Sequence, residues 1–305
     1  MPPQASYIWM DGQLVPWAEA KVHVFTHSLH YGSAVFEGIK AYEVDGALCV
    51  FRLEDHMKRL LRSASLLHLN CRFSLEQLCE AVTALLKANR FQDSVYIRPL
   101  LYVGPYGISL DYSGFETHVA ILAFPFRAYF EKLGLRVCTS SWRRLPESSV
   151  PLHAKAAANY LNLSLATIEA RRAGYDEAIL LDQEGFVSEG AGENVFLVKD
   201  NRLITPSPAS SILHGITRHT VLTMANDMGL EVEERRVARS ELYEADELFF
   251  TGTATEIQSV LSVDGREIGG GKPGRLTLQL IQLYGRTVRG QEPRYLSWVT
   301  KVDCR

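Results

Sequence analysis

A lysine, a tyrosine and a glutamate form the chemically most suggestive group in this sequence. Lys155 lies among alanines in residues 153–158, and Tyr160 follows shortly after it. Glu189 comes about thirty residues later, within the run Ser188-Glu-Gly-Ala-Gly-Glu-Asn194. An ammonium group that is removed from water has a lowered pKa, so a desolvated lysine becomes a nucleophile at neutral pH. Such a lysine can form an imine with a carbonyl carbon.

The combination matches what pyridoxal phosphate requires of a protein. Lys155 can form a Schiff base with the aldehyde, and Glu189 can keep the ring nitrogen protonated. Tyr160 can donate to the phenolate oxygen of the ring. Residues 213–218 begin a predicted helix whose first N–H groups, with the Thr217 hydroxyl, can bind the phosphate. The sequence therefore predicts an enzyme that transfers amino groups with pyridoxal 5′-phosphate.

Each of these features also has an ordinary structural explanation. Lys155 can be a surface lysine that leads into a helix beginning near Asn159. Tyr160 can be a core aromatic, and Glu189 a solvated loop carboxylate. Residues 213–218 can be a glycine turn before a helix. The occurrence of all four features in one chain favours the cofactor site.

The whole-chain composition is typical of a globular enzyme. With 305 residues, the chain exceeds the size at which one hydrophobic core usually keeps growing, so two domains with a cleft between them are expected. Apolar residues make up 47% and charged residues 22% of the chain. The net charge of −3, without any basic run, predicts no nucleic-acid or membrane partner. The expected partners are small-molecule substrates.

Location and metal binding follow from a few local features. The first residues show no targeting signal, and the apolar run 119–126 is too short to span a bilayer. Five scattered cysteines without a C-x-x-C pair indicate reduced thiols, so we expect a cytoplasmic protein without a metal site. His23, His27 and His30 have a spacing that would suit a metal on a helix. Because residues 21–25 alternate like a strand, structural histidines are expected instead.

The order of the predicted elements indicates an α+β fold. Strand patterns come first, then two helices, then strands again. The second helix starts with the capping box of Ser74 and Gln77. A linker at residues 125–136 is expected to join a small N-terminal α/β domain, residues 1–124, to a larger domain, residues 137–305. Several strands of the larger domain are joined by short turns, which predicts a mostly antiparallel sheet with helices around it.

Four motifs in this order resemble the class IV aminotransferases, which are pyridoxal-phosphate enzymes of fold type IV. They are Lys155-Ala-Ala-Ala-Asn-Tyr160, Ser188-Glu-Gly-Ala-Gly-Glu-Asn-Val-Phe196, Gly215-Ile-Thr-Arg218 and Thr251-Gly-Thr-Ala254. The N-terminal half narrows the resemblance to the branched-chain aminotransferases. Its motifs are Lys21-Val-His-Val, His30-Tyr-Gly32, Val35-Phe-Glu-Gly-Ile39 and Tyr96-Ile-Arg-Pro99.

The resemblance implies a role for each cofactor-binding residue. Lys155 would form the Schiff base and move the substrate proton, Glu189 would pair with the ring nitrogen, and Tyr160 would bond the ring phenolate. The phosphate would be bound by Ile216, Thr217, Thr253 and Arg59. For Arg59 the helical periodicity alone predicts a solvent-facing position, nearly opposite the apolar side chains of the same helix.

The resemblance also implies the substrate site and an oligomer. Tyr96 and the backbone of Thr253 and Ala254 would hold the α-carboxylate. Arg98, with Tyr31, would bind the distal carboxylate of glutamate or 2-oxoglutarate, a planar bidentate contact. The side chains that would surround a branched donor are Tyr31, Phe36, Phe126 and Tyr129. A homodimer or higher homo-oligomer is expected, since the family builds each site partly from a second chain.

Three departures from the family pattern leave the donor range open. Residues 107–110 read Gly-Ile-Ser-Leu where many members have Gly-Val-Asn-Pro, Lys40 stands in place of a common arginine, and Phe126-Arg127 replaces a common Trp-Gly. Aromatic L-amino acids are therefore possible donors. A D-amino-acid or (R)-amine aminotransferase, or a lyase, is another alternative, although the loop 105–112 lacks the arginine and histidine of the D-specific relatives. A third alternative is a non-catalytic ligand-binding protein.

Overall fold

The computed structural model describes residues 5–304 and divides them into two compact units. Unit 1 holds the chain up to Arg127, the short segment Ala154–Ala158 and the residues from Arg286 onward. Unit 2 holds Ala128–His153 and Asn159–Gly285. The first four residues, which contributed to the targeting prediction, lie outside the described part. The predicted domain limits stay a prediction, and the residues around Lys155 group with unit 1.

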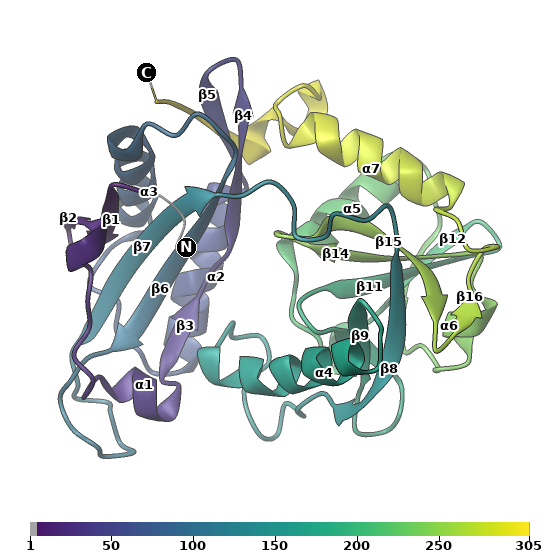
Figure 1. Cartoon of the computed structure of the whole chain (residues 1–305), viewed down its shortest axis with the longest axis horizontal. Coiled ribbons are helices and arrows are strands. Elements are labelled where there is room, and N and C mark those ends of the chain that lie inside the picture. Colours follow the sequence, from purple (N-terminus) through teal and green to yellow (C-terminus); the bar gives the residue numbers. More distant parts are fainter. Residues whose placement is uncertain (1–4, 305) are drawn as a thin grey trace. The chain divides into compact units, whose positions relative to one another are not determined.

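Unit 1 is built on an antiparallel sheet (Figure 1). Its strand order is β17 (Val299–Asp303), β5 (Ala47–Phe51), β4 (Ile39–Val44), β6 (Val95–Val103), β7 (Thr117–Pro125), β1 (Tyr7–Met10) and β2 (Gln13–Pro16), and β3 (Ala34–Phe36) also pairs with β6. Every neighbouring pair is antiparallel. The strands predicted to follow the two helices are confirmed as β6 and β7.

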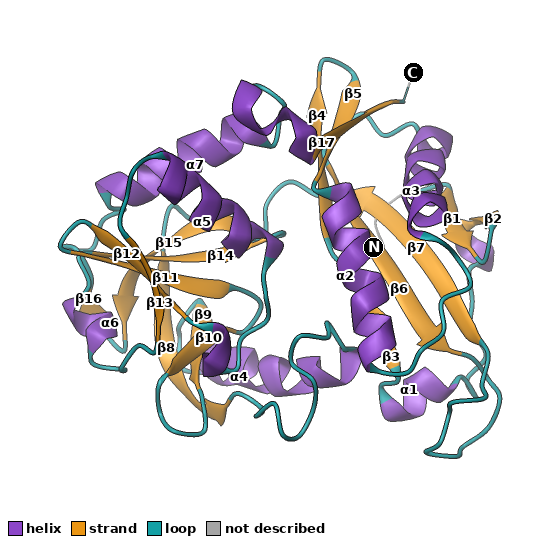
Figure 2. Ribbon diagram, turned by 180° about the vertical axis from the view of Figure 1, so that it is seen from behind, coloured by secondary structure: helices purple, strands orange, loops and turns teal. Residues whose placement is uncertain are grey.

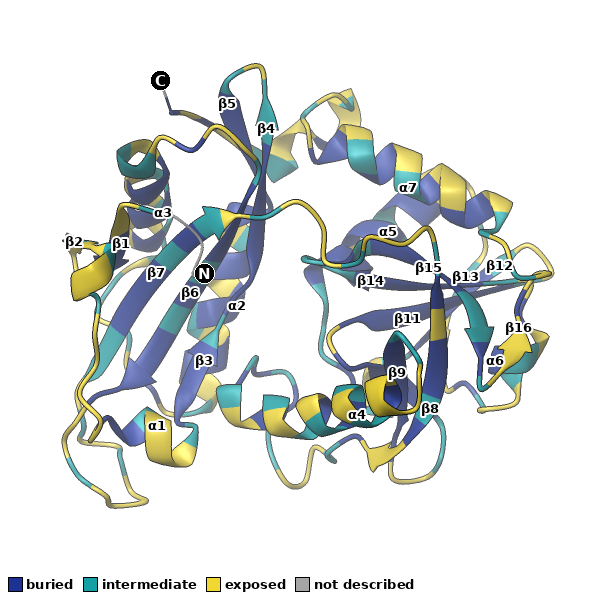
Figure 3. Cartoon of the chain, viewed as in Figure 1, coloured by how far each residue is buried: buried dark blue, intermediate teal, exposed yellow. Residues whose placement is uncertain are grey.

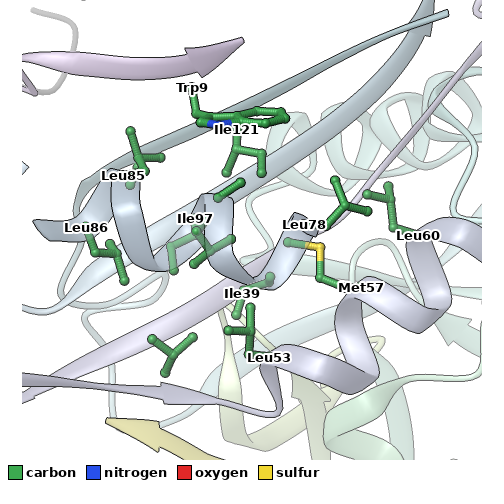
Figure 4. Close-up of a cluster of buried hydrophobic side chains, with 14 of the residues drawn as sticks. Trp9, Ile39, Leu53, Met57, Leu60, Leu78, Leu85, Leu86, Ile97 and Ile121 are labelled. Carbon is green, nitrogen blue, oxygen red and sulfur yellow. The ribbon is translucent and has the colours of Figure 1, made fainter. Parts of the chain in front are cut away.

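Two helices cover one face of this sheet (Figure 2). They are α2 (Leu53–Leu66) and α3 (Leu75–Asn89), and both present an apolar stripe to the strands. Figure 4 shows Met57 and Leu60 of α2 beside Leu78 of α3, with Ile97 and Ile121 of the sheet in the same cluster. The predicted capping box is confirmed, because Ser74 and Gln77 bond each other's backbone N–H groups.

The strand predicted at residues 21–25 is wrong. These residues form no helix or strand, and both Val22 and Val24 are exposed, so their alternation marks no buried face. His27 and His30 lie instead on the short helix α1 (His27–Tyr31). His27 Nδ1 lies 2.7 Å from Ser33 Oγ, and its Nε2 lies 2.9 Å from the carbonyl oxygen of Ser109. Across the described residues, no group of three or more His, Cys, Asp or Glu side chains is placed to hold a metal ion.

Unit 2 contains a second, mixed sheet. Its order is β10 (Val187–Gly190), β9 (Glu177–Leu181), β8 (Leu135–Arg143), β15 (Glu256–Val263), β14 (Glu247–Gly252), β11 (Asn194–Lys199), β12 (Arg202–Pro206) and β13 (Val232–Arg235), and β16 (Arg266–Glu267) pairs with β15. The pairs β8–β9, β8–β15 and β12–β13 are parallel, and the others are antiparallel. The prediction of a mostly antiparallel sheet is confirmed.

The helices of unit 2 follow the predicted pattern. They include α4 (Tyr160–Arg172), α5 (Ile216–Asp227), α6 (Glu241–Glu244) and most of α7 (Arg275–Thr287). Gly174 and Gly229 lie just after α4 and α5 with left-handed φ values of 83° and 74°, as expected for glycines that end helices. Figure 3 shows that β9 and β11 are buried along nearly their whole length. Within residues 5–304, no helix has the length and apolar character needed to cross a membrane.

Replacing Ser74 by alanine should weaken the start of α3. The substitution removes the hydroxyl that accepts the Gln77 N–H, so the free energy of unfolding should fall by about 1 kcal/mol in urea titrations. Ser65→Ala is the matched control, because Ser65 is exposed near the end of α2 and should change stability by less than about 0.5 kcal/mol. Equal effects of the two substitutions would contradict the capping role.

Candidate active site

The backbone of Lys155 is fixed to unit 1 at both its N–H group and its carbonyl group. The neighbouring Ala156 forms an isolated antiparallel bridge with Val35 of β3. The Phe36 N–H donates to the Lys155 carbonyl oxygen at 3.1 Å, and the Lys155 N–H donates to Ser63 Oγ of α2 at 3.0 Å. Gly32 allows the segment to approach, since a Cβ at that position would lie 2.9 Å from the Ala158 Cβ. The lysine is therefore held by β3 and α2, not carried by a surface helix.

The surroundings of the Lys155 amine favour its neutral form. Burial lowers the pKa of Lys155 to about 8, and the positive charge of Arg59 acts in the same direction. The Glu37 carboxylate opposes this shift. The amine lies 5.1 Å from the centre of the Phe36 ring. An appreciable share of the lysine is thus unprotonated near neutral pH, as a nucleophile requires.

Arg59 is buried, so the solvent-facing position predicted from helical periodicity is wrong. Only 5% of its surface is exposed, and its Nε donates to Glu37 Oε1 at 2.6 Å while Nη2 donates to Oε2 at 2.9 Å. His56 Nδ1 lies 2.7 Å from the same Oε2. The helix α2 therefore buries two faces, one apolar against the core and one polar that carries His56, Arg59 and Ser63. The spacing of apolar residues along a helix reveals only its apolar face, so it cannot show that a polar face is also buried.

Three further predicted residues of unit 1 form one group on β3 and β6. The Arg98 guanidinium lies 4.7 Å from the centre of the Phe36 ring and 5.4 Å from that of Tyr96. Arg98 Nη2 also donates to the Tyr96 hydroxyl at 3.4 Å. Gly38 makes room for this hydroxyl, because a Cβ there would lie 1.8 Å from it. Phe36, Tyr96 and Arg98 are thus brought together, next to Lys155.

Phe126 and Tyr31 lie at the margins of unit 1. The Phe126 ring is tilted against Tyr96, with 5.4 Å between the ring centres. The Lys40 ammonium lies 5.6 Å from the Phe126 ring and donates to the Arg127 carbonyl oxygen at 3.0 Å. Two of the three departures from the family pattern, Lys40 and Phe126-Arg127, are therefore in contact. Tyr31 is exposed on α1, and its ring contacts His27 at 4.7 Å.

Glu189 is the centre of the corresponding group in unit 2. It is buried on β10, and Arg144, immediately after β8, donates from Nε to its Oε1 at 2.8 Å. The other oxygen, Oε2, accepts from Asn194 Nδ2 at 3.1 Å and from the Leu213 N–H at 3.0 Å. A carboxylate with a guanidinium and two amide donors is suited to its ionised form. This is the form that pairs with a protonated ring nitrogen.

Asn194 links Glu189 to the start of α5. Its Nδ2 also donates to the Leu213 carbonyl oxygen at 2.9 Å. A Cβ on residue Gly215 would lie only 2.0 Å from the Asn194 Oδ1, so this close approach requires glycine. Gly215 is the N-cap of α5, and no side chain caps the helix there. The amides of Ile216 and Thr217 thus begin a helix whose partial positive charge favours an anion. Both residues are buried.

Thr253 and Ala254 lie in the turn between β14 and β15, and a buried glutamate, Glu193, bonds this turn to the residues that follow β10. Glu193 Oε1 accepts from the Thr255 hydroxyl at 2.9 Å, and Oε2 accepts from the Gly192 N–H at 3.0 Å. Burial raises the pKa of Glu193 to about 8, and the nearby Glu177 adds to the effect.

The two predicted tyrosines of unit 2 have different surroundings. Tyr160 starts α4 and is half-buried against the small core of Cys138, Leu163 and Ala166. Tyr129 is exposed, and its ring meets Phe130 edge-on at 4.8 Å. The predicted site residues therefore belong to both units, with Lys155 in unit 1 and Glu189 in unit 2.

Comparison with known proteins identifies the family. The sequence model of the family described as amino-transferase class IV matches residues 34–263, which is most of the chain. The chain belongs to the class IV aminotransferase family. The fold of a class IV enzyme, expected from the motifs, is confirmed as well.

Several similar proteins are branched-chain aminotransferases. The chain is 43% identical to the branched-chain-amino-acid aminotransferase of Escherichia coli (strain K12), over 98% of each protein. A branched-chain aminotransferase from Thermoproteus uzoniensis, crystallised with norvaline, superposes with a TM-score of 0.95 at 46% identity, covering 98% of this chain and 99% of the other. The PLP-form of the Thermobaculum terrenum enzyme gives a TM-score of 0.92 at 42% identity, covering 97% and 98%.

Sequence reasoning missed two charged residues of these groups, Glu37 and Arg144. Glu37 lies inside the motif Val35-Phe-Glu-Gly-Ile39, so its position in a family motif was a usable signal. Arg144 follows a strand in a stretch with a second arginine, Arg143, and nothing local distinguishes the two. Only the fold shows that Arg144 is buried and Arg143 exposed.

Removing the Arg144 guanidinium should destabilise unit 2 strongly. Arg144→Met leaves the Glu189 carboxylate buried without its cationic partner, so the free energy of unfolding should fall by about 3–5 kcal/mol. Thermal and urea unfolding measure the effect. Arg143→Met is the matched control, since this neighbour is exposed and should change stability by about 0.5 kcal/mol or less. A small, equal effect of both changes would show that the buried pair is not needed.

Proposed function

We propose that this protein is a branched-chain L-amino-acid aminotransferase. A donor such as leucine leaves its amino group on the enzyme as the branched 2-oxo acid departs, and 2-oxoglutarate then collects the group as L-glutamate. The observation that carries the proposal is the Lys155 amine, held with a lowered pKa beside Arg59, Phe36 and Arg98. The names of the relatives, at 42–46% identity over nearly the whole chain, agree with this substrate class.

The cofactor is pyridoxal 5′-phosphate, and the side chains present fit it. When bound, the cofactor supplies the aldehyde carbon that accepts the amino group and a cationic ring that takes up electrons. Lys155 would hold it through the amine and would move the proton of the substrate Cα with its Nζ. Glu189 would keep the ring nitrogen protonated, and Tyr160 would bond the ring phenolate. The residues that hold the phosphate are Arg59, Ile216, Thr217 and Thr253.

The substrate residues divide between carboxylate binding and side-chain binding. Tyr96, Thr253 and Ala254 hold the α-carboxylate. Arg98 binds the distal carboxylate of the acidic substrate, a task that suits a guanidinium already positioned by the Phe36 and Tyr96 rings. The walls of the donor pocket are Tyr31, Phe36, Phe126 and Tyr129.

A broader donor range is the second candidate function. The Lys40 ammonium lies over Phe126, whose ring is smaller than the tryptophan common at this place in the family. A smaller ring leaves more space for a bulky donor. Aromatic L-amino acids would then be accepted together with leucine, isoleucine and valine.

The expected location of the protein is the cytoplasm. All five cysteines are free thiols, and burial raises the pKa of Cys79 and Cys138 to about 11. Unreactive, unpaired thiols suit a reducing compartment.

The protein should also assemble into at least a homodimer. Val24 and Leu29 on one segment of unit 1, and Ile108 and Leu110 on another, are all more than half exposed. His27 links the two segments: its backbone N–H donates to the Gly104 carbonyl oxygen, and its Nε2 lies 2.9 Å from the Ser109 carbonyl oxygen. Neighbouring exposed apolar side chains of this size are typical of protein interfaces.

A donor panel tests the activity directly. Protein loaded with the cofactor should convert L-leucine and 2-oxoglutarate into glutamate, and Lys155→Ala should lower the rate by about 1,000-fold or more, because the proton-transfer group is lost. Lys58→Ala, an exposed change on α2, should leave the rate unchanged. The panel adds L-phenylalanine, D-alanine and one chiral amine. Absence of turnover with every branched donor would remove the proposal, and activity confined to D-alanine or the amine would favour the other class IV activities.

A single charge in the exposed apolar region should separate the subunits. Leu110→Asp places a carboxylate where 77% of the leucine surface is exposed, so sedimentation velocity should show a monomer. Leu133→Asp, at a position 90% exposed in unit 2, is the control and should keep the wild-type sedimentation coefficient. A monomeric wild-type protein would contradict the assembly.

A further inference from the structure

One carboxylate in unit 1 receives an unusual number of hydrogen bonds. Glu37 is fully buried, and four N–H groups point at it. Arg59 donates from Nε at 2.6 Å and from Nη2 at 2.9 Å, His56 lies at 2.7 Å through Nδ1, and the Gly38 N–H donates at 3.2 Å. The Glu37 backbone is fixed as well, because its N–H donates to the Pro99 carbonyl oxygen at 2.9 Å. The carboxylate therefore has a defined position.

The charges in this cluster can be assigned from their surroundings. Burial alone would raise the pKa of Glu37, but the Arg59 guanidinium and His56 hold it well below its usual range, so the carboxylate is ionised. Burial lowers the pKa of His56, which is therefore neutral with its proton on Nδ1. Glu37 and Arg59 then cancel each other in charge. The charge left to vary is that of the Lys155 amine.

Lys155 and the Glu37 cluster share the polar face of α2. His56, Arg59 and Ser63 lie three and four residues apart along the helix, and all three are buried. Ser63 bonds the Lys155 backbone, and Arg59 acts on the Lys155 amine through its charge. Glu37, before β4, and Tyr96 and Arg98 of β6 also act on the amine, and His56 is coupled to it through charge. Glu37 is the carboxylate among these groups.

We infer that Glu37 is a positioning residue of the active site: it holds the Arg59 guanidinium in place and offsets its positive charge beside Lys155. The inference rests on the proposed function, in which Lys155 must lose its proton to react and Arg59 must face an anion. Without Glu37, the buried guanidinium would act on the amine without its carboxylate counter-charge. With Glu37 present, both members of the ion pair act on the Lys155 amine, and their effects on its pKa partly cancel.

Substitutions of Glu37 and of Arg59 should shift the pKa of Lys155 in opposite directions. Glu37→Gln keeps the size of the side chain but removes the negative charge, so the pKa of Lys155 should fall below its value of about 8. Arg59→Met removes the positive charge and leaves the carboxylate, so the pKa of Lys155 should rise. A purely structural role would give no such pair of opposite shifts.

The measurement uses the full-length protein freed of cofactor. Trace labelling with acetic anhydride across pH 6–10, followed by peptide mass spectrometry, reports the neutral fraction of Lys155 at each pH. In Glu37→Gln the midpoint should fall by about 1 pH unit, which raises the labelling of Lys155 at pH 7 about fivefold. Glu43→Gln, a half-buried carboxylate on β4, is the matched control and should leave the midpoint unchanged.

The outcomes separate this inference from the proposed function. A folded Glu37→Gln protein with an unchanged or higher midpoint would overturn the inference. Should that variant fail to fold, Arg59→Met decides, since a raised midpoint supports the charge balance and an unchanged one refutes it. Failure of the wild-type enzyme to use leucine would contradict the proposed function. The labelling of the cofactor-free protein does not depend on turnover and would still test the role of Glu37.

Discussion

Burial of charge next to a lysine amine is the constraint around which unit 1 is organised. The Lys155 amine, the proposed nucleophile, is taken out of water and lies near the positive charge of Arg59. Both conditions are unfavourable for a protonated amine. The structure meets them with few parts. Two backbone hydrogen bonds fix the Lys155 segment, Phe36 covers the amine, and Glu37 balances Arg59.

Unit 2 repeats this arrangement with the opposite charge at its centre. Glu189 is buried, and Arg144, Asn194 and the Leu213 amide give it donors on both oxygens. Because Asn194 also holds the start of α5, the carboxylate and the helix end that suits an anion are fixed to each other. In both units a buried ion pair thus holds a predicted site residue in place, Arg59 through Glu37 and Glu189 through Arg144. Removing one member is expected to do more harm than removing both.

The regular elements supply the rigidity that these groups need. Phe36, Tyr96 and Arg98 extend from strands β3 and β6, which pair with each other, and Arg59 extends from a helix whose other face is part of the core. Glycine is required at specific points of close approach, such as Gly38 beside the Tyr96 hydroxyl and Gly215 beside Asn194. Groups carried by packed strands and helices keep their geometry better than groups on loops.

The sequence alone determined the features that depend on near neighbours or on whole motifs. The capping box at Ser74, the α+β order of elements and the family could all be read from it, and the roles of Lys155 and Glu189 stay predictions made from the motifs. Only the tertiary structure decided which charges are buried. Arg59 and Glu37 are 22 residues apart, and Arg144 and Glu189 are 45 apart. Periodicity and propensity describe contacts within a turn or a strand, whereas an ion pair between distant elements forms only once packing has brought them together and excluded water.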